Sequence, residues 1–192
     1  RYATPEVLVV SHVLGELDQA GEDELRALIS RSKRVLIVEP GNRALARRLS
    51  GLRDDLLDRF SVIAPCPHQR TCPALAAEND WCHFFATPPP EVFTDGFWAR
   101  VARELSIDLR SLPYAFLAMA RQDEATTAAT LSGDVRLLGR AEIHKHFARV
   151  RSCSEAGLEQ IEIPKRHEPQ IWRALKKRPE QVREAQAERD RD

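Results

Sequence analysis

Val7-Leu8-Val9-Val10 and Val35-Leu36-Ile37-Val38 are two short, continuously apolar runs rich in β-branched residues. Runs of this kind are typical of strands that are buried on both faces of a parallel sheet. Between them, residues 21–32 place apolar side chains at helical spacing behind an acidic first turn, where the helix dipole favours negative charge. The sequence therefore predicts a strand–helix–strand unit at the start of the chain.

The same alternation continues downstream. Helical spacing resumes over residues 43–57, a third strand is expected at about 59–64, and a fourth at 114–120 follows a helix suggested by residues 97–102. A cysteine-rich insertion at residues 65–90 separates the last two strands. Strands that alternate with helices predict an α/β fold.

The last third of the chain has a different pattern. Three alternating stretches predict a small antiparallel β unit; they cover residues 135–138, 147–153 and 158–163. Residues 169–188 are expected to form a helix, and the polar tail after Arg178 is expected to fray. The predicted domains are a partial α/β domain at 1–130, the β unit at 131–168, and a basic helix with its frayed tail at 169–192.

Composition restricts the classes of protein that fit. The chain has 192 residues and a formal net charge of zero, so no global field indicates a nucleic-acid partner. No apolar run approaches the roughly 20 residues that span a bilayer, and Arg1–Pro5 does not resemble a secretory signal. We therefore expect a bacterial cytoplasmic protein with no membrane partner. Cytosolic thiols stay reduced, so its four cysteines favour metal binding over disulfides.

The cysteines form the main candidate site. Cys66, Cys72 and Cys82 lie on one proline-rich segment, and Cys153 lies in the predicted β unit, so a shared metal would join that unit to the sheet. The spacing matches neither a zinc ribbon nor a ferredoxin run, and it leaves zinc and an iron–sulfur cluster equally open. His68 and His83 are alternative ligands for zinc. The simplest alternative is four unrelated buried thiols.

Several segments occur in an order that resembles one family. They are Ser11-His12-Val13-Leu14-Gly15-Glu16-Leu17, Val38-Glu39-Pro40-Gly41, Ala64-Pro65-Cys66-Pro67-His68 with Cys72-Pro73, Trp81-Cys82-His83-Phe84, and Cys153-Ser154-Glu155-Ala156-Gly157 with Lys165-Arg166. Together, from about residue 6 to 178, they resemble the methyltransferase-like family of small-ribosomal-subunit proteins found in bacteria and mitochondria. The cysteine segment is the specific part of this resemblance.

The resemblance implies a fold, a cofactor and a partner. The fold would be the carboxyl-terminal half of a Rossmann-like class I methyltransferase sheet, with the cysteine insertion and the small antiparallel β unit added to it. Cys66, Cys72, Cys82 and Cys153 would hold a [4Fe–4S] cluster, with zinc as the alternative, and the partner would be small-subunit ribosomal RNA. S-adenosylmethionine would bind only a full-length protein, because no glycine-rich cofactor loop occurs in this chain.

Catalytic residues are not evident. In the fold that the resemblance implies, Ser11, His12 and Glu16 would face the transferred methyl group, with Glu39 a weaker candidate. The expected Asp or Asn followed by Pro-Pro and an aromatic residue is missing. His12 and Glu16, spaced i and i+4, are equally able to bond each other at a helix start.

The basic end of the chain supplies candidates for RNA contact. Residues 140–178 carry ten Lys and Arg against five Glu. The candidate phosphate contacts are Arg149, Arg151, Lys165 and Arg166. The alternative is an ordinary solvated charged face. Trp172 is able to stack on a base, but its helical spacing with Leu175 is more typical of a core residue.

Three functions fit these features. The first is a small-subunit assembly factor with a structural iron–sulfur cluster. The second is an active RNA methyltransferase whose cofactor-binding half lies upstream of residue 1. The third is a zinc-stapled nucleic-acid-binding module.

Overall fold

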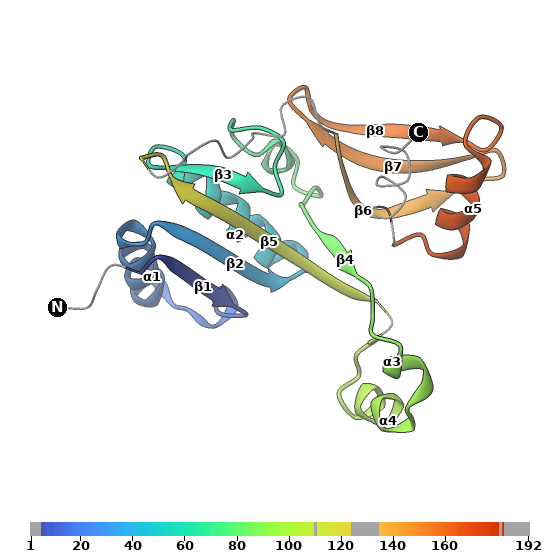
Figure 1. The fold of residues 1–192 in the computed structure, drawn as a ribbon, viewed down its shortest axis with the longest axis horizontal. Coiled ribbons are helices and arrows are strands. Elements are labelled where there is room, and N and C mark those ends of the chain that lie inside the picture. Colours follow the sequence, from blue (N-terminus) through green and yellow to red (C-terminus); the bar gives the residue numbers. More distant parts are fainter. Residues whose placement is uncertain (1–4, 110, 124–134, 181, 183–192) are drawn as a thin grey trace.

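The computed structural model describes residues 5–109, 111–123, 135–180 and 182. Figure 1 shows two sheets, with the cysteine-rich segment between β3 and β4 lying on the side of the first sheet that faces the second. The strands of the first sheet are β1 (Val7–Ser11), β2 (Arg34–Pro40), β3 (Phe60–Ala64), β4 (Phe84–Ala86) and β5 (Leu112–Arg121). Their order is β1-β2-β5-β3. β3 pairs with the last residues of β5, and β4 pairs with its first three residues.

Strand direction makes the first sheet mixed. β1 and β2 are parallel and are joined by helix α1 (Gln19–Arg31), whereas β5 runs antiparallel to β2, β3 and β4. The chain is thus a mixed α/β protein, as the alternation of strands and helices predicted. β5 can lie between β2 and β3 because the long insertion before it returns the chain to the middle of the sheet.

Side-chain caps fix where the two large helices begin. Asp18 accepts a hydrogen bond from Gly21 N at 2.9 Å at the start of α1, and Asn42 accepts one from Leu45 N at 2.9 Å at the start of α2 (Arg43–Leu56). Each cap satisfies a backbone donor that the first helical turn leaves without a partner.

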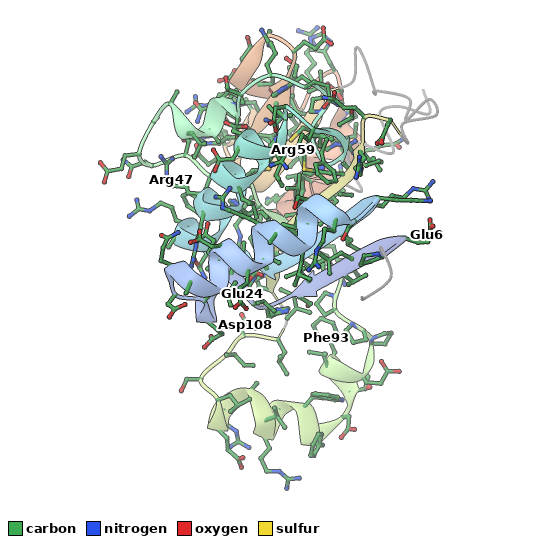
Figure 2. The ribbon with its side chains drawn as sticks, turned by 90° about the vertical axis from the view of Figure 1, so that its left-hand side faces the viewer. Glu6, Glu24, Arg47, Arg59, Phe93 and Asp108 are labelled. Atoms are coloured by element: carbon green, nitrogen blue, oxygen red, sulfur yellow. The ribbon has the colours of Figure 1, made fainter. Side chains whose placement is uncertain are left out.

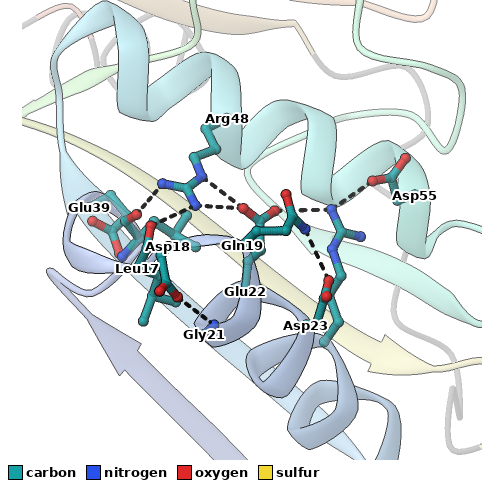
Figure 3. A network of polar contacts seen from close by, with 11 residues as sticks. Leu17, Asp18, Gln19, Gly21, Glu22, Asp23, Glu39, Arg48 and Asp55 are labelled. Atoms are coloured by element: carbon teal, nitrogen blue, oxygen red, sulfur yellow. Dashed lines mark hydrogen bonds and ion pairs between the residues drawn. The ribbon is translucent and has the colours of Figure 1, made fainter.

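The main core lies between these helices and one face of the first sheet. Ile29 of α1, Leu52 of α2, and the paired residues Ile37 and Leu117 are all almost fully buried there. Figure 3 shows that Arg48 of α2 binds the start of α1. Its Nη2 donates to Leu17 O at 3.2 Å, and its Nε donates to Glu22 Oε2 at 3.1 Å. The 3-10 turn η1 (Leu14–Glu16) links β1 to this network.

The prediction that both early strands are buried on both faces is wrong for β1. Val7 and Val9 are 51% and 63% exposed, because both helices cover the opposite face of the sheet. β2 is also buried on one face only, through Val35, Ile37 and Glu39.

The second sheet is antiparallel and has its own core. Its strands are β6 (Arg136–Ile143), β7 (Phe147–Ser154) and β8 (Gly157–Pro164), in that order. Helix α5 (Pro169–Lys177) packs Ile171, Trp172 and Leu175 on Val150 and Ile163. The helix predicted over 169–188 ends at Lys177, and the rest of that prediction and the frayed tail lie mostly outside the described residues. The predicted domain boundaries stay predictions.

A small helical segment projects from the sheet between the end of β4 and the start of β5. Helices α3 (Glu91–Thr94) and α4 (Gly96–Glu104) contain no buried residue. Figure 2 shows this segment, with Phe93 and Asp108 labelled, standing apart from the rest of the ribbon. None of the helices in the described part of the chain is long and apolar enough to cross a membrane.

Candidate metal centre

Three separate segments bring the four cysteines to one cavity. The loop after β3 supplies Cys66 and Cys72, the residue two before β4 is Cys82, and Cys153 lies near the end of β7. All four line a cavity of about 40 Å³, together with residues of α2, β5, β6 and β8. The cavity therefore lies where the two sheets meet, and a metal shared by the four cysteines stays a prediction.

Helix α2 holds the cysteine loop through a buried guanidinium. Arg53 is 2% exposed and pairs with Asp54. Its Nη2 donates to His68 O at 3.0 Å and its Nη1 to Arg70 O at 2.6 Å. Asp54 in turn accepts from Cys72 N at 2.9 and 3.1 Å. These bonds fix a loop that forms few backbone hydrogen bonds of its own.

A second arginine of α2 holds the part of the insertion that leads to Cys82. Arg47 Nη1 donates to the carbonyl oxygens of Ala74, Ala77 and Asp80 at 2.9, 2.7 and 2.8 Å. The first of these belongs to the 3-10 turn η2 (Pro73–Leu75), so the positive charge lies near the carbonyl groups at the end of that turn.

The two histidines beside the cysteines have different positions. His68 is 3% exposed, and its Nε2 lies 3.5 Å from Cys153 Sγ. Burial and the charges of Arg53 and Arg70 lower the pKa of His68, which favours the neutral ring. His83 does not line the cysteine cavity; its Nδ1 lies 3.4 Å from Trp81 O.

Burial and the proximity of other cysteines raise the pKa values of the Cys66, Cys82 and Cys153 thiols. Desolvation raises the pKa of Cys82 well above its ordinary value, and the charges of the other three cysteines add to this effect. Burial also raises the pKa of Cys66, opposed by Arg53, and the pKa of Cys153 to about 12. At neutral pH the Cys66, Cys82 and Cys153 thiols of the metal-free site are therefore protonated, and cation binding to them would release protons.

Polar atoms around the cavity indicate what would fit it. Arg53 Nε, His68 Nδ1 and Arg136 Nε are buried and have no hydrogen-bond partner among the described residues, and all three side chains line the cavity. Buried donors without acceptors are costly, so an anionic group with several acceptor atoms would suit this lining. Within the described residues, however, no group of three His, Cys, Asp or Glu side chains is arranged to hold a single metal ion.

The predicted RNA contacts do not form one cluster. Arg149 and Arg151 line a groove beside the cysteine cavity, where Arg149 Nη2 lies 3.2 Å from Glu162 Oε1 and Arg151 pairs with Asp80. Lys165 and Arg166 follow β8 and do not line this groove.

The base-stacking alternative for Trp172 is wrong. Trp172 is 5% exposed and donates to His144 O at 3.2 Å, and Lys165 Nζ lies 4.3 Å from the centre of its ring. The indole is a core residue of the second sheet.

The candidate methyl-transfer residues lie at the end of β1. Ser11 Oγ and His12 Nδ1 are 2.9 Å apart, so His12 bonds its neighbour rather than Glu16. His12 has a φ of 55°, which is uncommon for a residue with a side chain. Glu39 is fully buried, and its Oε1 accepts from the backbone nitrogens of Val13 and Leu14, both at 3.0 Å. Glu39 therefore has a structural role at this turn.

Arg53 is one of the residues at the site that we did not predict from the sequence, together with Arg47, Asp54 and Arg136. A signal for Arg53 exists, because Ala46, Leu49, Arg53 and Leu56 recur at helical spacing on the buried face of α2. An arginine on an apolar helix face is rarely buried without a charged or hydrogen-bonding partner.

The fold and the site define a class of protein. It is a mixed α/β protein whose cysteine cavity connects an antiparallel β unit to the main sheet. The family model described as mitochondrial small ribosomal subunit Rsm22 matches residues 2–179, so the chain belongs to this methyltransferase-like family. None of the curated proteins matches the chain.

Family membership changes one expectation. The family is described as mitochondrial, which contradicts the expectation of a bacterial cytoplasmic protein. That expectation rested on the absence of a recognisable targeting segment and on composition, and neither identifies a compartment. The family does associate the chain with the small ribosomal subunit, as the resemblance implied.

Proposed function

We propose that the chain acts in assembly of the small ribosomal subunit and contacts its RNA. In this proposal it is the carboxyl-terminal half of a protein that resembles an S-adenosylmethionine-dependent methyltransferase. Cys66, Cys72, Cys82 and Cys153 hold a structural [4Fe–4S] cluster. The observation that carries the proposal is the cavity itself, which four thiols from three segments line beside buried donors that have no partner among the described residues.

The arrangement of the thiols favours a cluster over a zinc ion. A single zinc needs all four sulfurs at about 2.3 Å from one point. A cluster is wider, because each cysteine binds a different iron. The four cysteines share one cavity, and within the part of the chain that the structure describes no three His, Cys, Asp or Glu side chains surround a single point.

Charge at the site also suits a cluster. A cluster with four thiolates is anionic and its sulfurs accept hydrogen bonds, and the nearby groups are the guanidiniums of Arg53 and Arg136 and the neutral ring of His68. When bound, the cluster would supply covalent links between the main sheet and the antiparallel unit. The protein provides all four ligands, so no iron keeps an open position for a substrate.

The sheet supports the methyltransferase-like fold. Parallel strands β1 and β2 carry their helices on one face, and antiparallel β5 lies between β2 and β3. In a complete sheet of this kind, further strands would pair with the edge strand β1, and helices would cover the opposite face, where Val7 and Val9 are exposed.

Metal analysis tests the proposal. Protein purified without oxygen should be brown, with about four irons and matching sulfide per chain. Variants with a single cysteine replaced by alanine should lose most of the iron. One zinc per chain and no visible absorption would instead support a zinc-stapled nucleic-acid module. Absence of any metal would support the alternative that the four cysteines are ordinary buried thiols.

A second candidate function is RNA methyl transfer by a longer protein. The observation that favours it is the left-handed backbone of His12 where β1 ends, because strained residues concentrate at functional sites. Calorimetry of the full-length protein with S-adenosylmethionine tests this candidate. Binding together with methylation of small-subunit RNA would support an enzyme, and absence of binding would favour an assembly factor without catalysis.

A further inference from the structure

A second cavity adjoins the cysteine site and is not part of it. It measures about 270 Å³ and lies between residues 79–83 and the strands of the second sheet. Its lining is Asn79, Asp80, Trp81, His83, Leu138, Gly139, Arg140, Glu142, Arg149, Val150, Arg151 and Gln160. We call it the arginine groove. Its size is close to the lower limit of ligand pockets, which is about 300 Å³.

One wall of the groove is aromatic. Trp81 and His83 stack with ring centres 4.8 Å apart and planes 16° apart, and Phe85 meets His83 edge-on at 5.6 Å. Gly139 allows this wall to lie close to β6: a Cβ there would be 3.0 Å from His83 Cε1, and its φ is +67°. Gly139 N also donates to His83 O at 3.0 Å. Strand β6 therefore contributes to the position of the His83 ring.

The other wall is cationic, and an irregularity of the sheet contributes to it. The β6–β7 register shifts between Leu138 and Glu142, and Arg140 lies within this bulge. Bulges commonly redirect a side chain next to a functional site. The Arg140 guanidinium lies 5.3 Å from the centre of the Phe85 ring, and its Nη2 donates to Ser111 Oγ at 3.0 Å.

Arg149 and Arg151 point to the same side of β7, since they are two residues apart. Their acidic partners are Glu142 and Glu162 for Arg149, and Asp80 for Arg151. The side chains of Arg149 and Arg151 are 34% and 44% exposed. Glu142 and Glu162 are exposed, and pairs with exposed carboxylates contribute little to stability, so a phosphate can replace them at Arg149 at small cost.

We propose that the arginine groove binds one unpaired nucleotide of RNA. The base lies against the Trp81–His83 wall, and its phosphate is bound by Arg140 and Arg149. The inference rests on the proposed function, because it names where the RNA of that function is held. Flat rings beside arginines suit a base and its phosphate, which is how proteins recognise unpaired RNA. An acidic peptide would use the arginines but has no group for the aromatic wall.

Fluorescence anisotropy of a labelled, short single-stranded RNA with the metal-loaded protein tests the groove. The R140A/R149A double variant should bind roughly tenfold or more weakly. The slope of log affinity against log salt should also fall by roughly 0.7 for each phosphate that the variant no longer neutralises. Both residues are partly exposed, so the variant should fold as the wild type does. R59A is the matched control, because Arg59 is 60% exposed and lies outside the groove, and it should bind as the wild type does.

A second measurement locates the base. RNA with 4-thiouridine, irradiated in the complex, should crosslink to the peptides that contain residues 79–85 or 138–140. If R140A/R149A bound RNA with wild-type affinity and K165A/R166A lost binding, the groove would not be the RNA site. The proposed function, in which the chain contacts RNA, would still stand. Absence of RNA binding by the wild-type protein would count against both. Binding of an acidic peptide in the groove without RNA binding would also overturn the inference.

Discussion

The Nε2 atom of His68 lies 3.5 Å from the Sγ atom of Cys153, although 85 residues separate them in the sequence. His68 belongs to the loop held by α2, and Cys153 belongs to β7. This buried contact connects the main sheet to the second sheet. The stability of the junction between the sheets should therefore depend on what the cysteine cavity contains.

The first prediction concerns Cys153. The C153A variant, prepared under metal-loading conditions, should contain much less iron than the wild type. Its unfolding temperature should also be lower, because metal binding and folding are coupled. In metal-free protein the same change removes only a small buried side chain and should cost about 1 kcal/mol. Iron content and thermal unfolding of both forms check this. L158A is the control: Leu158 lines the same cavity but has no ligand atom, so it should keep its iron. Equal iron in both variants would contradict ligation by Cys153.

The second prediction concerns Arg53. R53M should destabilise the protein by about 3 kcal/mol, because it leaves Asp54 without its charged partner and frees the carbonyl groups of His68 and Arg70. The looser loop should also bind metal less completely. Urea unfolding and iron content measure the two effects. The exposed R59M change should leave both within error, and a similar loss in R59M would show that position 53 has no special role.

Much of the main sheet was predictable from local sequence. Val35–Val38 identified β2, and Phe60–Ala64 identified β3, because apolar β-branched runs favour strands wherever they pack. The exposure of Val9 was not predictable, since it depends on which face of the sheet the helices cover, and that is decided by contacts far along the chain.

The candidate site was predictable in its residue types but not in its surroundings. The cysteines stood out because thiols are few and chemically distinctive. The partners of Arg53 and the pairing of Arg151 with Asp80 join residues that are far apart in sequence, and no local pattern specifies them. The three-residue strand β4 was missed because so short a stretch has no clear period. Its pairing with β5 supplies the hydrogen bonds that hold it.

The third prediction concerns Glu39. E39L should cost about 2–4 kcal/mol, because the backbone nitrogens of Val13 and Leu14 would both lose their acceptor in a buried turn. E39Q keeps an acceptor oxygen at the position of Oε1 and should cost much less. Denaturant unfolding of the two variants, which have similar volumes, measures the difference. Equal losses would show that packing, not the hydrogen bonds, requires the glutamate.

The fourth prediction concerns pH. Thiols in the unfolded chain lose their proton near pH 8.5, whereas the pKa of Cys153 in the fold is about 12 and those of Cys66 and Cys82 are raised. Between these values the unfolded state releases protons first, so the metal-free protein should lose stability as the pH rises above about 8. The limiting slope is about 1.4 kcal/mol per pH unit for each such thiol. Urea midpoints of reduced, metal-free protein across this range measure it. C153A should show a smaller slope, and a slope equal to that of the wild type would contradict the assignment.

The last prediction joins the two cavities. Cys82 lies between Trp81 and His83, and Leu138 lines both the cysteine cavity and the arginine groove. Loss of the metal should release Cys82 and with it the aromatic wall, so metal-free protein should bind the short RNA more weakly by about the same factor as R140A/R149A. Anisotropy titrations before and after removal of the metal, with iron measured in each sample, check this. In metal-free protein the R140A/R149A change should then add little further loss, because the groove has already changed its shape. Additive losses would show instead that the metal supports RNA binding at another surface.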